Sequence, residues 1–197
     1  MTGPDLRQNL MDALSRTGRA SSDFDLNTGV DLPPDRSLRD AAVLIAVHHD
    51  TGQLILTKRA ARLKHHPGQI AFAGGKVDAQ DADIIAAALR EANEEIGLQP
   101  PQVEVLGTLP GHETVTGFRV TPVVAVVHGD FTPIPEAGEV AEVFEVPLAH
   151  VTNPANFRVE GRQWQGHKRY YYTVPYGPYY IWGATARILR ALADRMS

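Results

Sequence analysis

Residues 74–97 decide the fold, and they read GGKVDAQDADIIAAALREANEEIG. The later part is rich in Ala, Leu and Ile, which predicts a helix over residues 82–96. Asp81 is the predicted N-cap, and Gly97 suits the left-handed position just past a helix end. Five apolar residues at helical spacing predict the buried stripe of this helix: Ile85, Ala88, Leu89, Ala92 and Ile96.

Three carboxylates share another face of the predicted helix. Glu91, Glu94 and Glu95 stand at i, i+3 and i+4, so their side chains lie within one turn. Like charges at this spacing repel one another unless a cation lies among them, and carboxylate oxygens are hard ligands suited to Mg²⁺ or Mn²⁺. A solvated acidic face is the simpler alternative. The preceding Gly74 and Gly75 favour a ligand site, because glycine lets the backbone approach a ligand closely.

This arrangement resembles the Nudix box of diphosphate hydrolases. The residues that carry the resemblance are Gly75, Asp81, Arg90, Glu91, Glu94, Glu95 and Gly97. Asp81 stands where the general pattern has Glu, and Arg90 lies one residue later than the pattern expects. With these departures the sequence resembles one branch of the family, the coenzyme A diphosphatases, whose loop is longer at this point.

A second motif, upstream of the box, resembles the same branch. It consists of Leu56-Thr57-Lys58-Arg59-Ala60, Lys64, Gly68 and Phe72-Ala73-Gly74-Gly75. Lys64 replaces the usual Arg, which keeps the charge but loses the bidentate fork. Ala73 replaces the usual Pro, which removes a rigid turn. The close match covers residues 54–98, and a looser one covers 40–189.

The resemblance implies an α/β protein with the Nudix fold, an α/β/α sandwich around a mixed central β-sheet. It implies a hydrolase that cleaves the diphosphate of coenzyme A or its derivatives to 3′,5′-ADP and 4′-phosphopantetheine. The implied cofactor is Mg²⁺ or Mn²⁺, with ligands from Glu91, Glu94, Glu95, Glu139 and the carbonyl of Gly74. The implied catalytic residues are Glu94, Glu95 and Glu139.

Two expectations from the resemblance leave an alternative open. Relatives commonly supply a further carboxylate from the segment that includes Glu139, and Glu142 is the alternative in that segment. Glu145 alternates with apolar residues, as an outward strand residue does. Arg90 is expected to brace the loop by pairing with an acid, either Asp81 or Asp78.

The segment before the glycines is basic. Residues 59–69 contain Arg59, Arg62, Lys64, His65 and His66 and no acid. Coenzyme A carries a diphosphate and a 3′-phosphate, and these cations could offset that charge. We therefore expect Arg59, Lys64 and His66 to bind substrate together with Gly75, the alternative being a solvated loop.

Length and composition favour a single domain over residues 1–197. We expect a helix over residues 4–16 and an extended loop to residue 39, then a core over 40–197 that ends in a helix. A linker is the simpler interpretation of residues 17–39, although they could wrap the domain or cover the substrate. The net charge of −4 argues against a nucleic-acid partner, and the absence of cysteine excludes disulfides. No segment resembles a signal peptide or a membrane span, so we expect a cytoplasmic monomer or homodimer acting on a small molecule.

The rest of the chain alternates strands and turns. β-branched or apolar runs predict strands over residues 41–47, 53–58, 103–109 and 120–127, and a paired hairpin over 157–163 and 169–174. Residues 111–117 are expected to form a flexible loop, and a final helix begins within residues 181–189. His48 and His49 fall at a turn and are assigned no role.

Two other functions are compatible with the sequence. A Nudix hydrolase of ADP-ribose or another nucleoside diphosphate derivative would use the same box, because the box handles only the diphosphate. A ligand-binding module without turnover is the alternative from another class. The presence of all three box carboxylates, Glu91, Glu94 and Glu95, argues against it.

Overall fold

Two parallel strands form the centre of the sheet. The computed structural model describes residues 2–27, 29, 36–164 and 166–197. In it, β2 (Arg39–His48) pairs with β8 (Phe118–Val127) along the full length of both strands. Both are runs of Val, Ile, Leu and Ala, as expected for strands that are buried on both faces.

Antiparallel strands extend the sheet on both sides, so that it is mixed. β3 (Gln53–Arg59) and β5 (Ala73–Lys76) share one edge of β2, with β3 at its end and β5 near its start. β9 (Val140–Pro147) and β4 (Ile70–Ala71) pair with β3. On the other side β6 (Val103–Thr108) and β7 (His112–Glu113) pair with β8, and β1 (Ser21–Ser22) lies parallel to β7.

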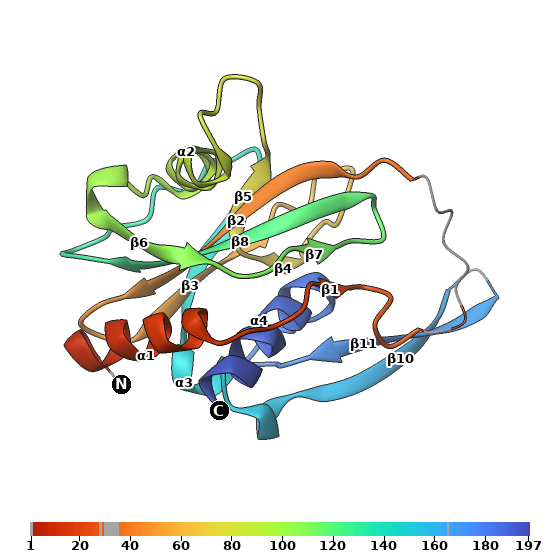
Figure 1. Ribbon diagram of the computed structural model, residues 1–197. Coiled ribbons are helices and arrows are strands. Elements are labelled where there is room, and N and C mark those ends of the chain that lie inside the picture. The colour runs from red at the N-terminus through yellow and green to blue at the C-terminus, as the bar shows by residue number, and fades with distance from the viewer. Residues whose placement is uncertain (1, 28, 30–35, 165) are drawn as a thin grey trace.

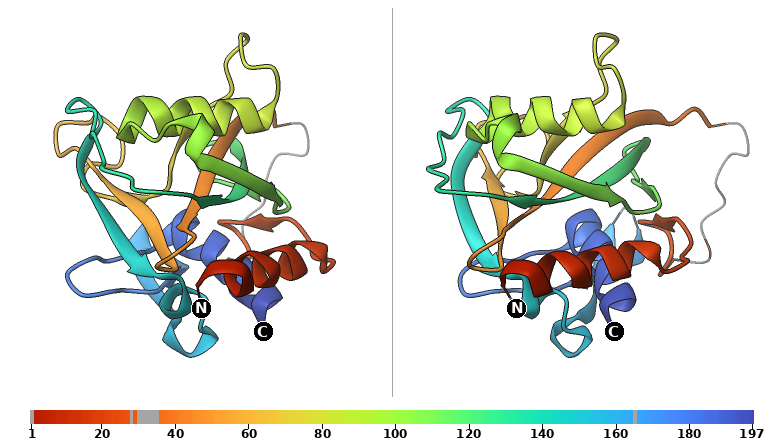
Figure 2. Two further views of the ribbon diagram at one scale, coloured as in Figure 1. Left: turned by 90° about the vertical axis from the view of Figure 1, so that its left-hand side faces the viewer. Right: turned by 60° about the vertical axis from the view of Figure 1, so that its left-hand side comes forward.

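Helices cover both faces of this sheet (Figures 1 and 2). On one face, α2 (Ile84–Ile96) packs its buried Ala88 and Ala92 in one core with Leu44 and Ala125. On the other, α1 (Gly3–Ser15) and α4 (Gly183–Met196) pack in a second core with Ile45 and Val124. Neighbouring residues of β2 and β8 thus point to opposite cores, as the pleat of a strand requires. This confirms the predicted α/β/α sandwich.

A second sheet is formed by the hairpin of β10 (Arg158–Trp164) and β11 (His167–Thr173), which the sequence predicted. The short helices α3 (Leu148–Val151), η1 (Pro100–Gln102) and η2 (Pro154–Asn156) lie in the connections. The final helix begins at Gly183, within the expected range. No helix in the described part of the chain is long and apolar enough to cross a membrane.

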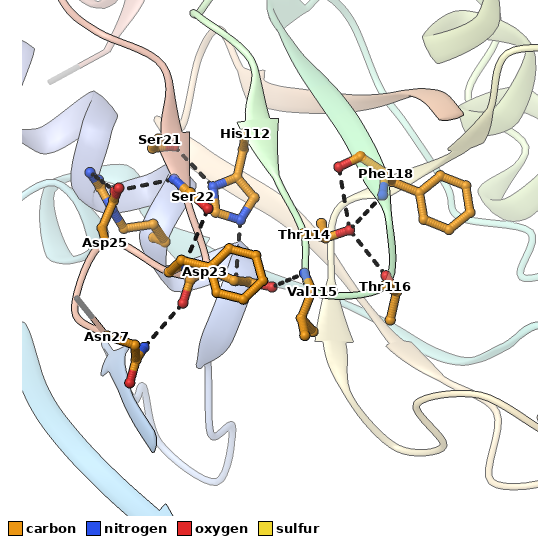
Figure 3. A network of polar contacts seen from close by, with 12 residues as sticks. Ser21, Ser22, Asp23, Asp25, Asn27, His112, Thr114, Val115, Thr116 and Phe118 are labelled. Atoms are coloured by element: carbon orange, nitrogen blue, oxygen red, sulfur yellow. Dashed lines mark hydrogen bonds and ion pairs between the residues drawn. The ribbon is translucent and has the colours of Figure 1, made fainter. Parts of the chain in front are cut away.

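The N-terminal segment is part of the sheet, which differs from the linker interpretation. Figure 3 shows the contacts that hold it. The buried His112 lies between two polar groups, with Nδ1 2.9 Å from the Ser21 hydroxyl and Nε2 3.3 Å from Asp23. The other oxygen of Asp23 accepts the Val115 N–H at 2.9 Å. These contacts fix β1 to β7, so part of the loop predicted over residues 111–117 is a strand. Residues 28 and 30–35 of the predicted linker lie outside the described part.

Candidate functional site

Helix α2 begins two residues later than predicted. Asp83 is its N-cap and accepts the Ala86 N–H at 2.8 Å, whereas the sequence pointed to Asp81. Asp81 is unavailable as a cap because its side chain binds Arg90. At the other end Gly97 takes the predicted left-handed conformation, with φ of 74°, and its N–H reaches the carbonyls of Ala92 and Asn93.

Arg90 joins the helix to the loop that precedes it. Its guanidinium donates to both oxygens of Asp81, at 2.9 and 3.0 Å, and to the carbonyl of Lys76 at 3.1 Å. The hydrogen bond to Asp81 and, after it, the one to Glu91 raise the pKa of Arg90 further, and Arg90 holds the pKa of Asp81 below its ordinary value. Asp78 lies farther away, at 3.8 Å, so Asp81 is the main partner of the two that the sequence left open. The sequence did not predict the contact with Lys76, because every residue has a backbone carbonyl and the residue type does not show which one accepts a hydrogen bond.

Glu95 is the most buried of the three carboxylates. Only 5% of the residue is exposed, and its Oε2 accepts the Gly74 N–H at 3.1 Å. Burial raises its pKa to about 7 despite that hydrogen bond, and the charges of Glu91 and Glu139 add to the rise while Arg59 opposes it. Arg59 and the Gly74 N–H therefore compensate the charge of Glu95 only in part, and a bound cation would supply the rest.

Glu91 packs against the glycine strand. A Cβ atom on Gly75 would lie 2.5–2.7 Å from the Glu91 carboxylate, so this contact depends on glycine. Burial raises the pKa of Glu91, and the hydrogen bond from Arg90 at 3.0 Å only partly offsets this effect. Glu94 is different: its side chain is 58% exposed and its Oε2 accepts from Arg90 at 3.1 Å. The three side chains therefore share a turn but not one environment.

Gly74 must be glycine for a steric reason. Its φ is 153°, in the region that side chains rarely adopt, and a Cβ would lie 2.3 Å from the Ala42 carbonyl oxygen. Without a side chain, β5 approaches β2 closely enough to present the Gly74 N–H to Glu95.

The loop before β9 brings Glu139 to the end of α2. The N–H groups of Ile134 and Glu136 donate to the carbonyls of Ile96 and Glu95, at 2.9 and 2.8 Å. Glu139 follows on this anchored loop, and its charge acts on both Glu91 and Glu95. The alternative, Glu142, accepts the Tyr179 hydroxyl at 2.6 Å, and Glu145 is exposed and lies 3.0 Å from His48. Of these three carboxylates, Glu139 is therefore the one whose charge acts on the cluster.

The basic loop over residues 59–69 lies against the same segment. Its Ala60 N–H donates to the Glu139 carbonyl at 2.8 Å, and Arg62 donates to the carbonyl of Ala137. Arg59 lies close enough to lower the pKa of Glu95. Lys64 and His66 are exposed, and His66 has a left-handed φ of 53°. The structure thus brings Arg59 to the cluster and leaves Lys64 and His66 on the loop surface.

The cluster has donors of the right chemistry for a hard divalent cation, namely three carboxylates in one helical turn, and the charge of Glu139 acts on two of them. No three His, Cys, Asp or Glu side chains of the described residues already stand in a metal-binding arrangement. In this cluster, Arg90 binds both Glu91 and Glu94. Glu91 and Glu94, two of the residues that would hold a cation, are therefore also partners of Arg90, whose guanidinium is held by Asp81 as well.

Comparison with known proteins agrees with this architecture. Residues 38–168 match the family model described as the NUDIX domain. A protein of Enterobacter sp. (strain 638) named uncharacterized Nudix hydrolase NudL is 46% identical over 156 residues, 79% of this chain and 81% of that protein. A protein of the same name from Cronobacter sakazakii (strain ATCC BAA-894) is also 46% identical, with the same coverage.

Solved structures of similar proteins carry Nudix names as well. RenU, a Nudix hydrolase from M. Smegmatis, matches with a TM-score of 0.46 and 26% identity over 59% of this chain and 73% of its own. The MutT protein from Methanosarcina mazei Go1 matches with a TM-score of 0.48 and 19% identity over 60% and 83%. The match to the family model and the identity to the curated relatives together show that the chain belongs to the Nudix family of hydrolases.

Proposed function

We propose that this protein is a metal-dependent diphosphatase that cleaves coenzyme A or its derivatives. The observation that carries the proposal is the meeting of two groups of opposite charge. Glu91 and Glu95 lie at the glycine strand, where the charge of Glu139 acts on both, and the basic loop starting at Arg59 is bonded to the Glu139 backbone. A diphosphate substrate needs both, because its negative oxygens repel an attacking water until cations offset them.

The residues that would hold Mg²⁺ or Mn²⁺ are Glu91, Glu94, Glu95 and Glu139, with the carbonyl of Gly74. When bound, a divalent cation neutralises the diphosphate and lowers the pKa of water. The raised pKa values of Glu91 and Glu95 support this assignment, because they indicate carboxylates whose negative charge is poorly compensated by the protein alone.

Glu139 is the preferred general base. It is exposed, on a loop whose backbone is anchored to α2, and so could reach a water at the cluster. Glu94, the other candidate, shares the Arg90 guanidinium with Glu91 and Asp81. In the proposed reaction the base takes a proton from water, the water oxygen bonds to one phosphorus, and the P–O–P bridge breaks. The products are 3′,5′-ADP and 4′-phosphopantetheine, with one water consumed.

Arg59, Lys64 and His66 are the proposed substrate-binding residues, with the backbone at Gly75. Arg59 is close enough to the carboxylates to contact the diphosphate itself. Lys64 and His66 are farther along the exposed loop and suit the 3′-phosphate. The upstream motif supports coenzyme A over other diphosphates, because this loop is the part that resembles the coenzyme A branch.

A hydrolysis panel tests the proposal. Purified protein with MgCl₂ is given coenzyme A, its disulfide, acyl forms, 3′-dephospho-coenzyme A, ADP-ribose and NADH, and products are separated by chromatography. We expect coenzyme A or its derivatives to give the highest kcat/KM, with all activity lost in EDTA. Lys64→Ala should reduce the preference for coenzyme A over the 3′-dephospho form, while Arg119→Ala, which removes an exposed ion pair with Asp40, should not. A clear preference for ADP-ribose would replace the proposal with the alternative substrate class.

A further inference from the structure

Aromatic side chains gather where the hairpin meets the start of α4. Trp182, the residue before the helix, lies with its ring centroid 5.2 Å from that of Tyr171 and 6.4 Å from that of Tyr180. The guanidinium carbon of Arg162 lies 5.3 Å from the centroid of the Trp182 ring. We call Tyr171, Tyr180 and Trp182 the aromatic platform.

The platform is held in place by polar contacts at its rim. The Tyr180 hydroxyl donates to Glu160 at 2.7 Å and lies 3.4 Å from the Tyr171 hydroxyl. Glu160 and Tyr171 are directly opposite on the paired strands β10 and β11. Although Tyr180 is fixed in this way, 43% of it is exposed. An aromatic face that is both fixed and exposed can stack on a planar ring without a large loss of conformational freedom.

The platform adjoins the far end of the basic loop. A Cβ atom on Gly183 would lie 3.7 Å from the side-chain nitrogen of Gln69, and the Thr185 hydroxyl donates to the Ile70 carbonyl at 3.0 Å. Figure 1 shows the start of α4 next to β4 accordingly. The loop folds back on itself, because the Arg59 N–H donates to the Gln69 carbonyl at 2.9 Å. Its base, formed by Arg59 and Gln69, therefore adjoins the aromatic platform through Gln69 and the carboxylate cluster through Arg59, whose charge acts on Glu95.

We infer that the platform, and Tyr180 in particular, binds the purine ring of the substrate. This inference rests on the proposed function. The order of groups on the protein is carboxylates, then the base of the basic loop, then exposed aromatic rings. The order along the nucleotide half of the substrate is diphosphate, then a phosphorylated ribose, then adenine. Tyr180 and Trp182 lie outside residues 38–168, the range that matches the Nudix domain model, so the domain match does not account for them.

The experiment measures equilibrium binding of 3′,5′-ADP by calorimetry, with ribose 5-phosphate as a ligand that has sugar and phosphate but no base. Tyr180→Leu removes the ring, and Tyr180→Phe keeps the ring but removes the hydroxyl. Tyr170→Leu is the matched control: Tyr170 is also exposed, at 40%, but neighbours Tyr171 on the strand and so points to the opposite face. Thermal melting of each variant shows that it is folded.

We expect Tyr180→Leu to weaken 3′,5′-ADP binding about tenfold, in line with the loss of one stacked base. The affinities of Tyr180→Phe and Tyr170→Leu for 3′,5′-ADP should stay within about twofold of that of the wild type, because neither change removes the stacking ring. The affinity for ribose 5-phosphate, which has no base to stack, should be the same in all variants. Wild-type affinity in a folded Tyr180→Leu, or an equal loss in Tyr170→Leu, would overturn the inference.

The wild type is assayed in parallel for coenzyme A hydrolysis. This assay distinguishes a failure of the purine-site inference from a failure of the proposed function. Hydrolysis with unchanged nucleotide binding in Tyr180→Leu refutes the platform alone. A base-dependent loss of 3′,5′-ADP binding in a protein that does not hydrolyse coenzyme A refutes the proposed function and leaves the purine site standing. Absence of 3′,5′-ADP binding by an active wild type refutes the platform.

Discussion

Arg90 and Asp81 form a bidentate ion pair, in which both oxygens of the carboxylate accept from the guanidinium, at 2.9 and 3.0 Å. The Asp81 side chain is only 5% exposed, and its Oδ2 also accepts the Asp78 N–H at 2.8 Å. The pair therefore closes the loop between β5 and α2 and fixes the start of the helix that carries the three carboxylates. It also keeps a partner for Arg90 if Glu91 and Glu94 leave it.

Arg90→Lys should lower both stability and activity. Lysine keeps the charge but cannot donate two parallel bonds to Asp81 while also reaching Glu91 and Lys76. We expect a fall in Tm of about 2–4 °C and a rise in the KM for Mg²⁺, because the loop that leads into α2 is no longer fixed to the helix that carries the carboxylates. Thermal melting and a Mg²⁺ titration of activity measure these effects. Arg119→Lys, at an exposed ion pair, is the control, and an equal effect there would contradict the role given to Arg90.

The burial of Glu95 predicts a pH-dependent stability in the metal-free protein. Its folded-state pKa of about 7 exceeds the ordinary 4.5, so the folded state binds more protons between these values and loses stability as the pH rises. Above pH 7 the full effect is reached, about 3 kcal/mol from the shift alone. In EDTA, urea unfolding should show that Glu95→Gln gains stability relative to the wild type between pH 4.5 and 7.5.

The control for this prediction has the opposite sign. Arg7 lowers the pKa of Glu104, so Glu104→Gln should lose relative stability as the pH rises. If the difference between Glu95→Gln and the wild type does not change with pH, Glu95 is not held in the environment described here.

Gly74→Ala should destabilise the protein much more than Gly117→Ala. Both residues have a positive φ, of 153° and 80°, but a Cβ on Gly74 would overlap the backbone of β2 while one on Gly117 meets nothing within 4 Å. The free energy of unfolding should fall by about 1 kcal/mol for Gly117→Ala, from backbone strain, and by about 3 kcal/mol or more for Gly74→Ala. Equal losses in urea unfolding would show that the close approach of β5 to β2 is unimportant.

Gly75→Ala separates activity from stability. The added methyl group would displace the Glu91 carboxylate, which is the movable end of a side chain, and no backbone atom is among its three nearest contacts. We expect Tm to stay within about 2 °C and kcat/KM to fall at least tenfold, because the ligand set is disturbed while the fold is not. A normal kcat/KM would show that the position of Glu91 against Gly75 does not matter for the reaction.

Much of the fold could be predicted because its local signals agree with the tertiary structure. The Val- and Ala-rich runs of β2 and β8 lie at the centre of the sheet, and Gly97 ends α2 as expected. The N-cap prediction failed at Asp81 because a residue far along the helix, Arg90, competes for that carboxylate. Sequence spacing cannot weigh such a competition, although the expected pairing of Arg90 with an acid already pointed to it.

The candidate site was predictable in its residues but not in their environments. The i, i+3, i+4 spacing placed Glu91, Glu94 and Glu95 together, yet it could not tell the buried Glu95 from the exposed Glu94. That difference comes from the approach of β5 to the helix. For residues 17–39 the linker was the simpler interpretation and wrapping of the domain the alternative, and the sequence could not decide because β1 is held by His112, a residue distant in the chain.

The central claim is that buried carboxylates of α2 hold a divalent cation that makes the diphosphate cleavable. The most direct test is the Mg²⁺-dependent hydrolysis of coenzyme A by Glu95→Gln, compared with Glu104→Gln at a surface ion pair. Glutamine keeps the shape of Glu95 and can still accept the Gly74 N–H, so the fold should be retained. We expect a loss in kcat/KM of at least about 100-fold for Glu95→Gln and near-normal activity for Glu104→Gln. Near-normal turnover by a folded Glu95→Gln protein would contradict the assignment of Glu95 to a cation site.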